Sequence, residues 1–152
     1  MTTSRVDHST FVIERTFGAT VERVFATWSN PQKKRRWFAC HDDWKTVDYQ
    51  LDFREGGVEL NDVAEPDGTL HAFKGRYLDI VANQRIVYVY DMSVASERLS
   101  VSLVTVTFAA LGQKTKMTFT EQVVFLDGKD NAANREEGLA SMLDKIGESL
   151  AA

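Results

Sequence analysis

Residues 135–150 read REEGLASMLDKIGESL, and the spacing of their apolar side chains decides the fold. These side chains recur every three or four positions and therefore share one face of a helix; they are Leu139, Met142, Leu143, Ile146 and Leu150. The charged side chains of the segment fall elsewhere on the helix; they are Arg135, Glu136, Asp144, Lys145 and Glu148. The pattern predicts a C-terminal helix of about five to six turns after Asp127-Gly128, whose single apolar face has to be buried.

The segments before this helix alternate with a period of two, which is typical of half-buried strands. We expect six strands, at residues 46–53, 58–63, 73–80, 86–90, 99–108 and 115–126. Tight turns such as Glu55-Gly56-Gly57 and Pro66-Asp67-Gly68 separate several of them. Short turns indicate an antiparallel meander, and its concave side is the surface that the long helix can cover.

The N-terminal part predicts one more strand and two short helices. Thr10 to Phe17 alternates, Thr20 can cap a helix, and Asn30-Pro31 ends that helix and opens a second one. We expect residues 1–9 to be a loose N-terminus and 10–152 to form a single domain. The fold class is therefore α+β of the helix-grip kind, a curved antiparallel sheet of six to seven strands wrapped around a long C-terminal helix.

Composition excludes several classes of function. The chain has 152 residues and a net charge of −4, which does not suit a nucleic-acid-binding protein. The basic run Lys33-Lys34-Arg35-Arg36 is interpreted as a solvated helix face, with a local anion-contact site as the alternative. Cys40 is the single cysteine, which rules out an intrachain disulfide and fits a reducing compartment.

Targeting and membrane signals are not expected. The first ten residues, MTTSRVDHST, contain no apolar stretch typical of a secretory signal. No apolar run approaches the roughly 20 residues of a membrane span. We therefore expect a cytoplasmic protein that does not bind membranes.

A cavity is expected because one helix covers the middle of a coiled sheet and leaves its ends open. Aromatic side chains at inward positions either fill this space or line a pocket, and periodicity does not decide between the two. Our hypothesis is a site for a small, mostly apolar ligand. Its proposed lining is Trp37, Phe53, Tyr77, Tyr88, Tyr90, Glu121, Met142 and Leu143.

The histidine, acidic and cysteine side chains that could take part in catalysis do not match the spacing of a known catalytic or metal-binding motif. His8, His41 and His71, with the acids Asp42, Asp43 and Glu121, match no metal-ligand motif, so neither a metal nor a cofactor is expected. No G-x-S-x-G elbow occurs, and Cys40 has no predictable base.

Glu121 is the acid of most interest, as the candidate catalytic residue. It shares strand parity with Met117, Phe119, Val123 and Phe125, so it points to the same face as those apolar residues. Burial there raises the pKa of a carboxyl, which suits a proton shuttle or a ligand anchor. The alternative is a structural pair with Arg76 or Arg85.

Four stretches, taken in order, resemble the AHSA-like group (activator of heat-shock ATPase homologues) of the START-related, polyketide-cyclase-like superfamily. They are FGATVERVFATWSNP at 17–31 with Trp37 following, FREGG at 53–57, GRYLDIVANQRIVY at 75–88, and TKMTFTEQ at 115–122 followed by REEGL at 135–139. The resemblance spans about Phe11 to Leu150 and implies the helix-grip fold. It also places Trp37, Phe38, His41 and Trp44 at one lip of the cavity mouth, with a cap on the core as the alternative.

Two departures limit what the resemblance implies about function. Ala82 replaces a common proline, and Glu137-Gly138-Leu139 stands where relatives often have His-Gly-Trp, which removes a histidine and a tryptophan from the mouth. The leading hypothesis stays a small-molecule-binding protein without a cofactor, with an edge-mediated homodimer as a possible assembly. The alternatives are a cyclase- or dehydratase-like enzyme that uses Glu121 with Tyr88 or Tyr90, and a co-chaperone-like interaction module, for which the companion domain of the heat-shock activator is not expected here.

Overall fold

The computed structural model describes residues 3–38 and 43–151, which form one antiparallel sheet and three helices. The strands are β1 (Val6–Phe17), β2 (Lys45–Leu51), β3 (Val58–Ala64), β4 (Leu70–Val81), β5 (Arg85–Val94), β6 (Glu97–Leu111) and β7 (Lys114–Leu126). The helices are α1 (Val21–Ser29), α2 (Pro31–Trp37) and α3 (Ala132–Ala151). The strand order is β1-β7-β6-β5-β4-β3-β2, so β1 reaches its place beside the last strand and the others form a meander.

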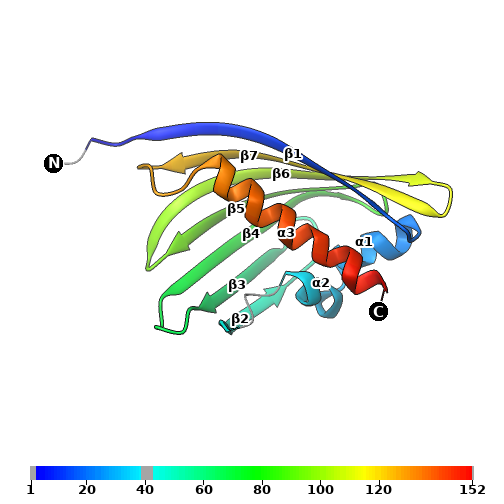
Figure 1. Ribbon diagram of the computed structural model, residues 1–152, viewed down its shortest axis with the longest axis horizontal. Helices are drawn as coiled ribbons and strands as arrows, with labels where there is room; N and C mark the ends of the chain where they lie inside the picture. The colour runs from blue at the N-terminus through cyan, green and yellow to red at the C-terminus, as the bar shows by residue number, and fades with distance from the viewer. Residues whose placement is uncertain (1–2, 39–42, 152) are drawn as a thin grey trace.

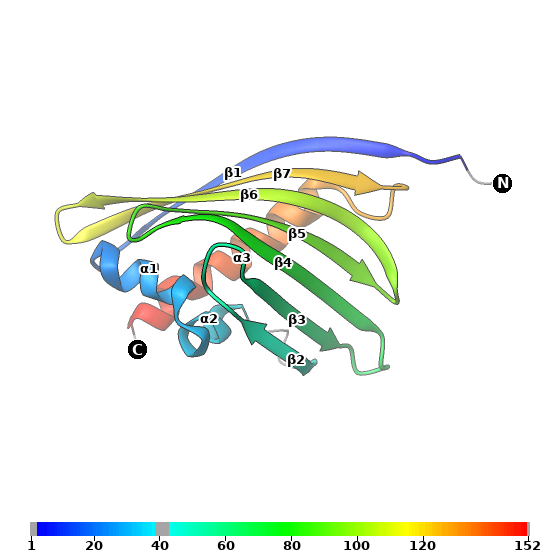
Figure 2. The same cartoon turned by 180° about the vertical axis from the view of Figure 1, so that it is seen from behind.

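The sheet curves around α3, as the sequence predicted. In Figure 1 the long helix runs diagonally across one face of the sheet, and α1 and α2 lie at the end where α3 finishes. The view from behind shows the opposite face of the sheet, which no helix covers (Figure 2). This is the helix-grip-like α+β architecture, and it confirms the predicted fold class.

The core lies between the concave face and α3. Along β7 every second side chain is buried, and this confirms the parity predicted for Met117, Phe119, Glu121, Val123 and Phe125. Leu143 and Ile146 of α3 are fully buried against this layer, while Leu139, Met142 and Leu150 are partly buried. Burial of a leucine-sized side chain stabilises the fold by about 1.5–3 kcal/mol, so this stripe holds α3 in place.

The break between α1 and α2 is built by Asn30 and Pro31. The Asn30 side chain accepts hydrogen bonds from the backbone N–H of Gln32 (3.0 Å) and Lys33 (3.1 Å), and Pro31 occupies the first turn of α2. Thr20 does precede α1, but its side chain makes no capping hydrogen bond. Asn30 therefore supplies the cap that positions α2 beside the sheet.

The sequence-based boundaries need two corrections. β1 begins at Val6, four residues before the expected Thr10, because the register with β7 continues to the pair Val6 and Leu126. The period-two alternation expected over residues 46–53 would bury the apolar Val47, but its side chain is 57% exposed. A register shift between Thr46 and Asp48 interrupts the alternation there, as a β-bulge does.

Within the described residues no helix has both the length and the apolar character needed to cross a membrane.

Candidate functional site

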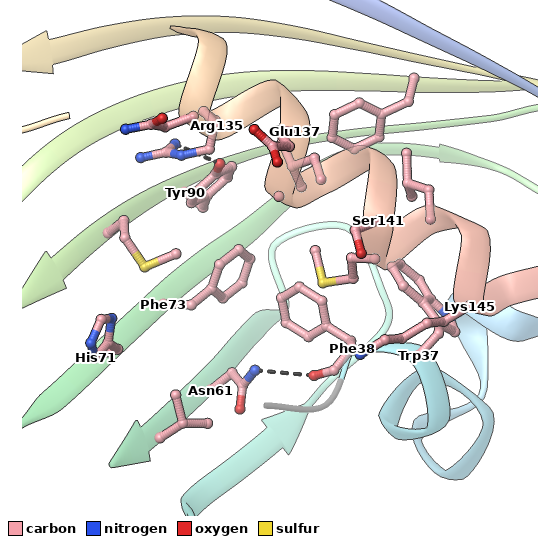
Figure 3. A pocket seen from close by; sticks show the side chains of 18 of the residues that line it. Trp37, Phe38, Asn61, His71, Phe73, Tyr90, Arg135, Glu137, Ser141 and Lys145 are labelled. Atoms are coloured by element: carbon pink, nitrogen blue, oxygen red, sulfur yellow. Dashed lines mark hydrogen bonds between the residues drawn. The ribbon is translucent and has the colours of Figure 1, made fainter. Parts of the chain in front are cut away.

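A pocket of about 750 Å³ lies between the concave face of the sheet and residues 134–145 of α3 (Figure 3). Eight aromatic side chains contribute to its wall: Trp28, Trp37, Phe38, Trp44, Phe73, Tyr88, Tyr90 and Phe119. Val63, Met92, Leu139, Met142 and Leu143 add aliphatic surface. The polar lining is Asn61, His71, Asp130, Asn134, Arg135, Glu137, Ser141 and Lys145. In the close-up, Arg135, Glu137, Ser141 and Lys145 follow α3, while His71 and Asn61 lie opposite on the strands (Figure 3).

The pocket brings together five of the eight lining residues expected from the sequence. Trp37, Tyr88, Tyr90, Met142 and Leu143 are on its wall. Phe53, Tyr77 and Glu121 are not: Phe53 packs against Tyr77 with ring centroids 4.9 Å apart, and Glu121 is fully buried in the sheet. Phe53 lies two residues beyond the end of β2 and packs against the core.

The remaining candidates lie apart from the pocket or outside the described residues. His8 is exposed on β1 and Asp43 is exposed in the loop before β2. Cys40, His41 and Asp42 lie outside the described residues, so the expectation that His41 joins the lip is not tested. Trp28, Phe38 and His71 line the pocket although the sequence-based list of lining residues did not include them. Trp28 belongs to the apolar stripe of α1, which was a usable signal.

Arg135 connects one end of the pocket to a buried polar network, which we call the Arg135 network. Its Nη1 donates to the Tyr90 hydroxyl (2.9 Å) and to Glu121 Oε2 (3.2 Å). Its Nη2 donates to Ser100 Oγ (2.7 Å) and to Asp130 Oδ2 (3.2 Å). Arg135 is only 8% exposed, so the expectation that it lies on the polar side of the helix was wrong. The long side chain reaches from the first turn of α3 down to the sheet, which the helical spacing does not reveal.

Glu121 is the centre of this network. Its Oε2 accepts hydrogen bonds from Tyr90 (2.8 Å), Ser102 (2.9 Å) and Arg135, while Oε1 has no partner in the described chain. Burial raises the pKa of Glu121, as expected, although the hydrogen bonds and the positive charge of Arg135 oppose this rise. The basic partner is Arg135 rather than the expected Arg76 or Arg85. Arg85 instead pairs with Asp79 at the surface.

The raised pKa of Glu121 predicts a pH dependence of stability. Between the usual carboxyl pKa of 4.5 and the higher folded-state pKa, the folded protein binds more protons than the unfolded chain. The unfolding free energy of the wild type, relative to Glu121→Gln, should therefore fall as pH rises through this interval, by about 1.4 kcal/mol per pH unit. Urea unfolding at a series of pH values measures this difference in unfolding free energy. Glu136 is exposed, so Glu136→Gln is the control for the change in net charge. A relative stability that rises with pH would contradict the assignment.

A second buried ion pair links α2 to β3. Lys34 Nζ donates to Glu59 Oε1 (2.9 Å) and Oε2 (3.0 Å), and both side chains are 1% exposed. The hydroxyls of Tyr77 and Tyr49 each donate to Glu59 at 2.8 Å. The basic run at 33–36 is thus not wholly solvated, because Lys34 is buried and pairs with Glu59 of β3.

Aromatic rings enclose the Lys34 ammonium group. Its Nζ lies 5.1 Å from the ring centroid of Trp28, 5.2 Å from that of Trp37 and 4.5 Å from that of Phe38. Each contact is close enough for a cation–π attraction. Burial lowers the pKa of Lys34, while the charge of Glu59 opposes this. The three rings also belong to the pocket wall, so the buried ion pair is in direct contact with that wall.

His71 is the one histidine on the pocket wall in the described part of the chain. Its Nε2 lies 2.7 Å from Glu65 Oε2, and its ring centroid is 4.5 Å from that of Trp44. A carboxylate on one ring nitrogen fixes the orientation of an imidazole. Among the described residues, no group of three or more His, Cys, Asp or Glu side chains is arranged to hold a metal ion.

The sheet, the two short helices and the long covering helix define a domain of the helix-grip-like class. Residues 18–151 match the family described as Activator of Hsp90 ATPase homolog 1-like protein. The chain belongs to this family, as the sequence resemblance indicated. A comparison with curated proteins gave no match.

Solved structures share this fold. A protein from Rhizobium leguminosarum is 50% identical over 99% of both chains, with a TM-score of 0.94. The Mll3558 protein from Rhizobium loti is 36% identical over 95% of this chain and 99% of its own, with a TM-score of 0.89. An AHSA1-like protein from Aeromonas hydrophila has a TM-score of 0.71 at 22% identity over 94% of this chain and 92% of its own, a likeness of fold alone.

Proposed function

We propose that this protein is a cytoplasmic binding protein for a small, mostly apolar molecule held between the sheet and α3. The observation that carries the proposal is the pocket of about 750 Å³ with eight aromatic side chains on its wall. Its volume falls in the range of about 300–1,000 Å³ typical of small-molecule sites. An apolar molecule released from water into such a space gains about 25 cal/mol per Å² of buried apolar surface.

The polar groups suit orientation of a ligand rather than chemistry on it. The Arg135 network fills one end of the pocket, and its charges are already paired. Glu121, the carboxyl on which an enzymatic alternative depended, does not line the pocket. The Tyr90 hydroxyl on the pocket wall does donate to Glu121, but that carboxyl is fully buried. The cyclase- or dehydratase-like hypothesis and the co-chaperone-like hypothesis therefore stay predictions.

Gly138 allows a direct test of the pocket. It lies three residues after Arg135 and four before Met142, on the face of α3 that lines the pocket, and a Cβ atom added there meets nothing within 4 Å. Gly138→Phe should place a ring in the pocket and weaken binding of the neutral fluorescent probe N-phenyl-1-naphthylamine. A ligand that shares an overpacked site loses about 1–3 kcal/mol, which is roughly 5- to 150-fold in Kd. Fluorescence titration measures the change.

Gly138→Ala is the matched control. It should raise the free energy of unfolding by about 0.5–1 kcal/mol, because alanine is the better helix former, and it should leave probe affinity unchanged. Equal affinities for Gly138→Phe and Gly138→Ala would show that the probe binds elsewhere. Native mass spectrometry of protein purified from its own host then identifies the bound molecule and, in the same measurement, shows whether the chain forms the edge-mediated homodimer.

A further inference from the structure

Three neighbouring tyrosines on the concave face differ in how their hydroxyls are satisfied. The hydroxyl of Tyr77 donates to Glu59 and that of Tyr90 donates to Glu121, each at 2.8 Å. Tyr88 lies between them, with ring centroids 5.7 Å from Tyr77 and 6.2 Å from Tyr90. Its hydroxyl makes no hydrogen bond to the described part of the chain. Tyr88 is 6% exposed, and a buried hydroxyl without a partner is costly.

The unpaired hydroxyl of Tyr88 borders open space on a side chain that lines the pocket. The partnerless side-chain atoms that are shut off from open space in the described residues are Trp28 Nε1 and Glu121 Oε1. The Tyr88 hydroxyl is not one of these atoms, so it borders open space, and Tyr88 forms part of the pocket wall. Burial raises the pKa of Tyr88 well above its usual value, so the group keeps its proton and stays a donor.

The charges on the wall do not favour an ion. The charged lining residues are Asp130, Arg135, Glu137 and Lys145, two of each sign. Arg135 already contacts Glu121 and Asp130, and its four Nη hydrogens are taken by the Arg135 network. Lys34 is behind the aromatic wall and pairs with Glu59. Glu137 and Lys145 form no ion pair among the described residues, but they are exposed and half-buried, respectively, on α3. An ionised ligand held against the buried aromatic wall, away from these two side chains, would lose its hydration without gaining a free countercharge.

We infer that the natural ligand is a neutral, aromatic-rich molecule with one hydrogen-bond-accepting oxygen, and that this oxygen pairs with the Tyr88 hydroxyl. The inference rests on the proposed function and names the chemical class that this pocket takes. The apolar part of the ligand packs against the aromatic wall, and the Tyr88 hydroxyl donates a hydrogen bond to the ligand oxygen and so fixes its position. A ligand without that oxygen leaves the hydroxyl unpaired, which is the basis of the discrimination.

Three probes of one shape test the inference. They are 2-acetylnaphthalene, a neutral ketone; 2-isopropenylnaphthalene, which replaces the carbonyl oxygen by CH₂; and 2-naphthoate, which carries a charge. Isothermal titration of the wild type should show the ketone binding roughly 3- to 10-fold more tightly than the hydrocarbon, the value of one net hydrogen bond. Naphthoate should bind more weakly than the ketone. In Tyr88→Phe the preference for ketone over hydrocarbon should disappear.

Tyr77→Phe is the matched control, because it removes a neighbouring hydroxyl that does not line the pocket. It should keep the preference for the ketone and lower the melting temperature, since Glu59 loses a donor. Equal binding of ketone and hydrocarbon by the wild type, a preference that survives in Tyr88→Phe, or tighter binding of naphthoate would each overturn the inference and leave the pocket proposal standing. Failure of all three probes to bind would remove the pocket proposal itself.

Discussion

Lys34→Met should cost about 3–5 kcal/mol of unfolding free energy, because removing one partner of a buried ion pair leaves the other charge uncompensated. Glu59 would keep the donors of Tyr49 and Tyr77 but lose the ammonium group that neutralises it. A domain of this size has a total stability of about 5–15 kcal/mol, so the loss is a large fraction of it. Urea unfolding and thermal melts measure the effect, which corresponds to a drop of roughly 10 °C or more.

Lys33→Met is the control one residue away. Lys33 is exposed, and substitutions at such positions usually change stability by about 0.5 kcal/mol or less. Glu59→Gln combined with Lys34→Met should be less damaging than the sum of the two single changes, since no isolated charge is left. Similar losses for Lys33→Met and Lys34→Met would show that Lys34 is not buried in solution.

Arg135→Met should be the second most damaging change, with a loss of about 3–5 kcal/mol from the same cause. The substitution leaves Glu121 without its positive partner and removes the donors to Tyr90 and Ser100. The first turn of α3 would then lose its polar attachment to the sheet. Because Arg135 also lies at one end of the pocket, the affinity for N-phenyl-1-naphthylamine should fall together with the unfolding free energy.

The pH dependence separates loss of charge from loss of packing. The charge of Arg135 lowers the pKa of Glu121, so that pKa rises further in Arg135→Met. A carboxyl whose folded-state pKa is raised loses stability as pH increases through that pKa, and the deficit of the variant should be larger at pH 8 than at pH 5. Arg135→Lys keeps the charge and should recover part of the loss, but not the paired contacts that a guanidinium fork makes. A deficit that does not change with pH would assign the role of Arg135 to packing alone.

Strand parity and helical spacing were enough to predict most of the fold from the sequence. The alternation along β7 placed Glu121 on the buried face, and the stripe on α3 identified Met142 and Leu143 as pocket residues. These signals are local, because a strand repeats every two residues and a helix about every 3.6. The same reasoning misplaced Val47, where a bulge breaks the alternation, and Val6, where pairing with β7 extends the strand.

The sequence by itself determined the order of the elements, the face that each one buries, and the presence of a carboxyl at position 121 on the inner side. Only the tertiary structure decided which charged side chains pair with one another. Lys34 pairs with Glu59, which is 25 residues away on another element, and Arg135 pairs with Glu121, which is 14 residues away on another element. A charge on a short helix has the same local pattern whether it faces water or a buried carboxylate. The choice depends on how elements distant in sequence pack together, since only that packing removes water and makes the ion pair necessary.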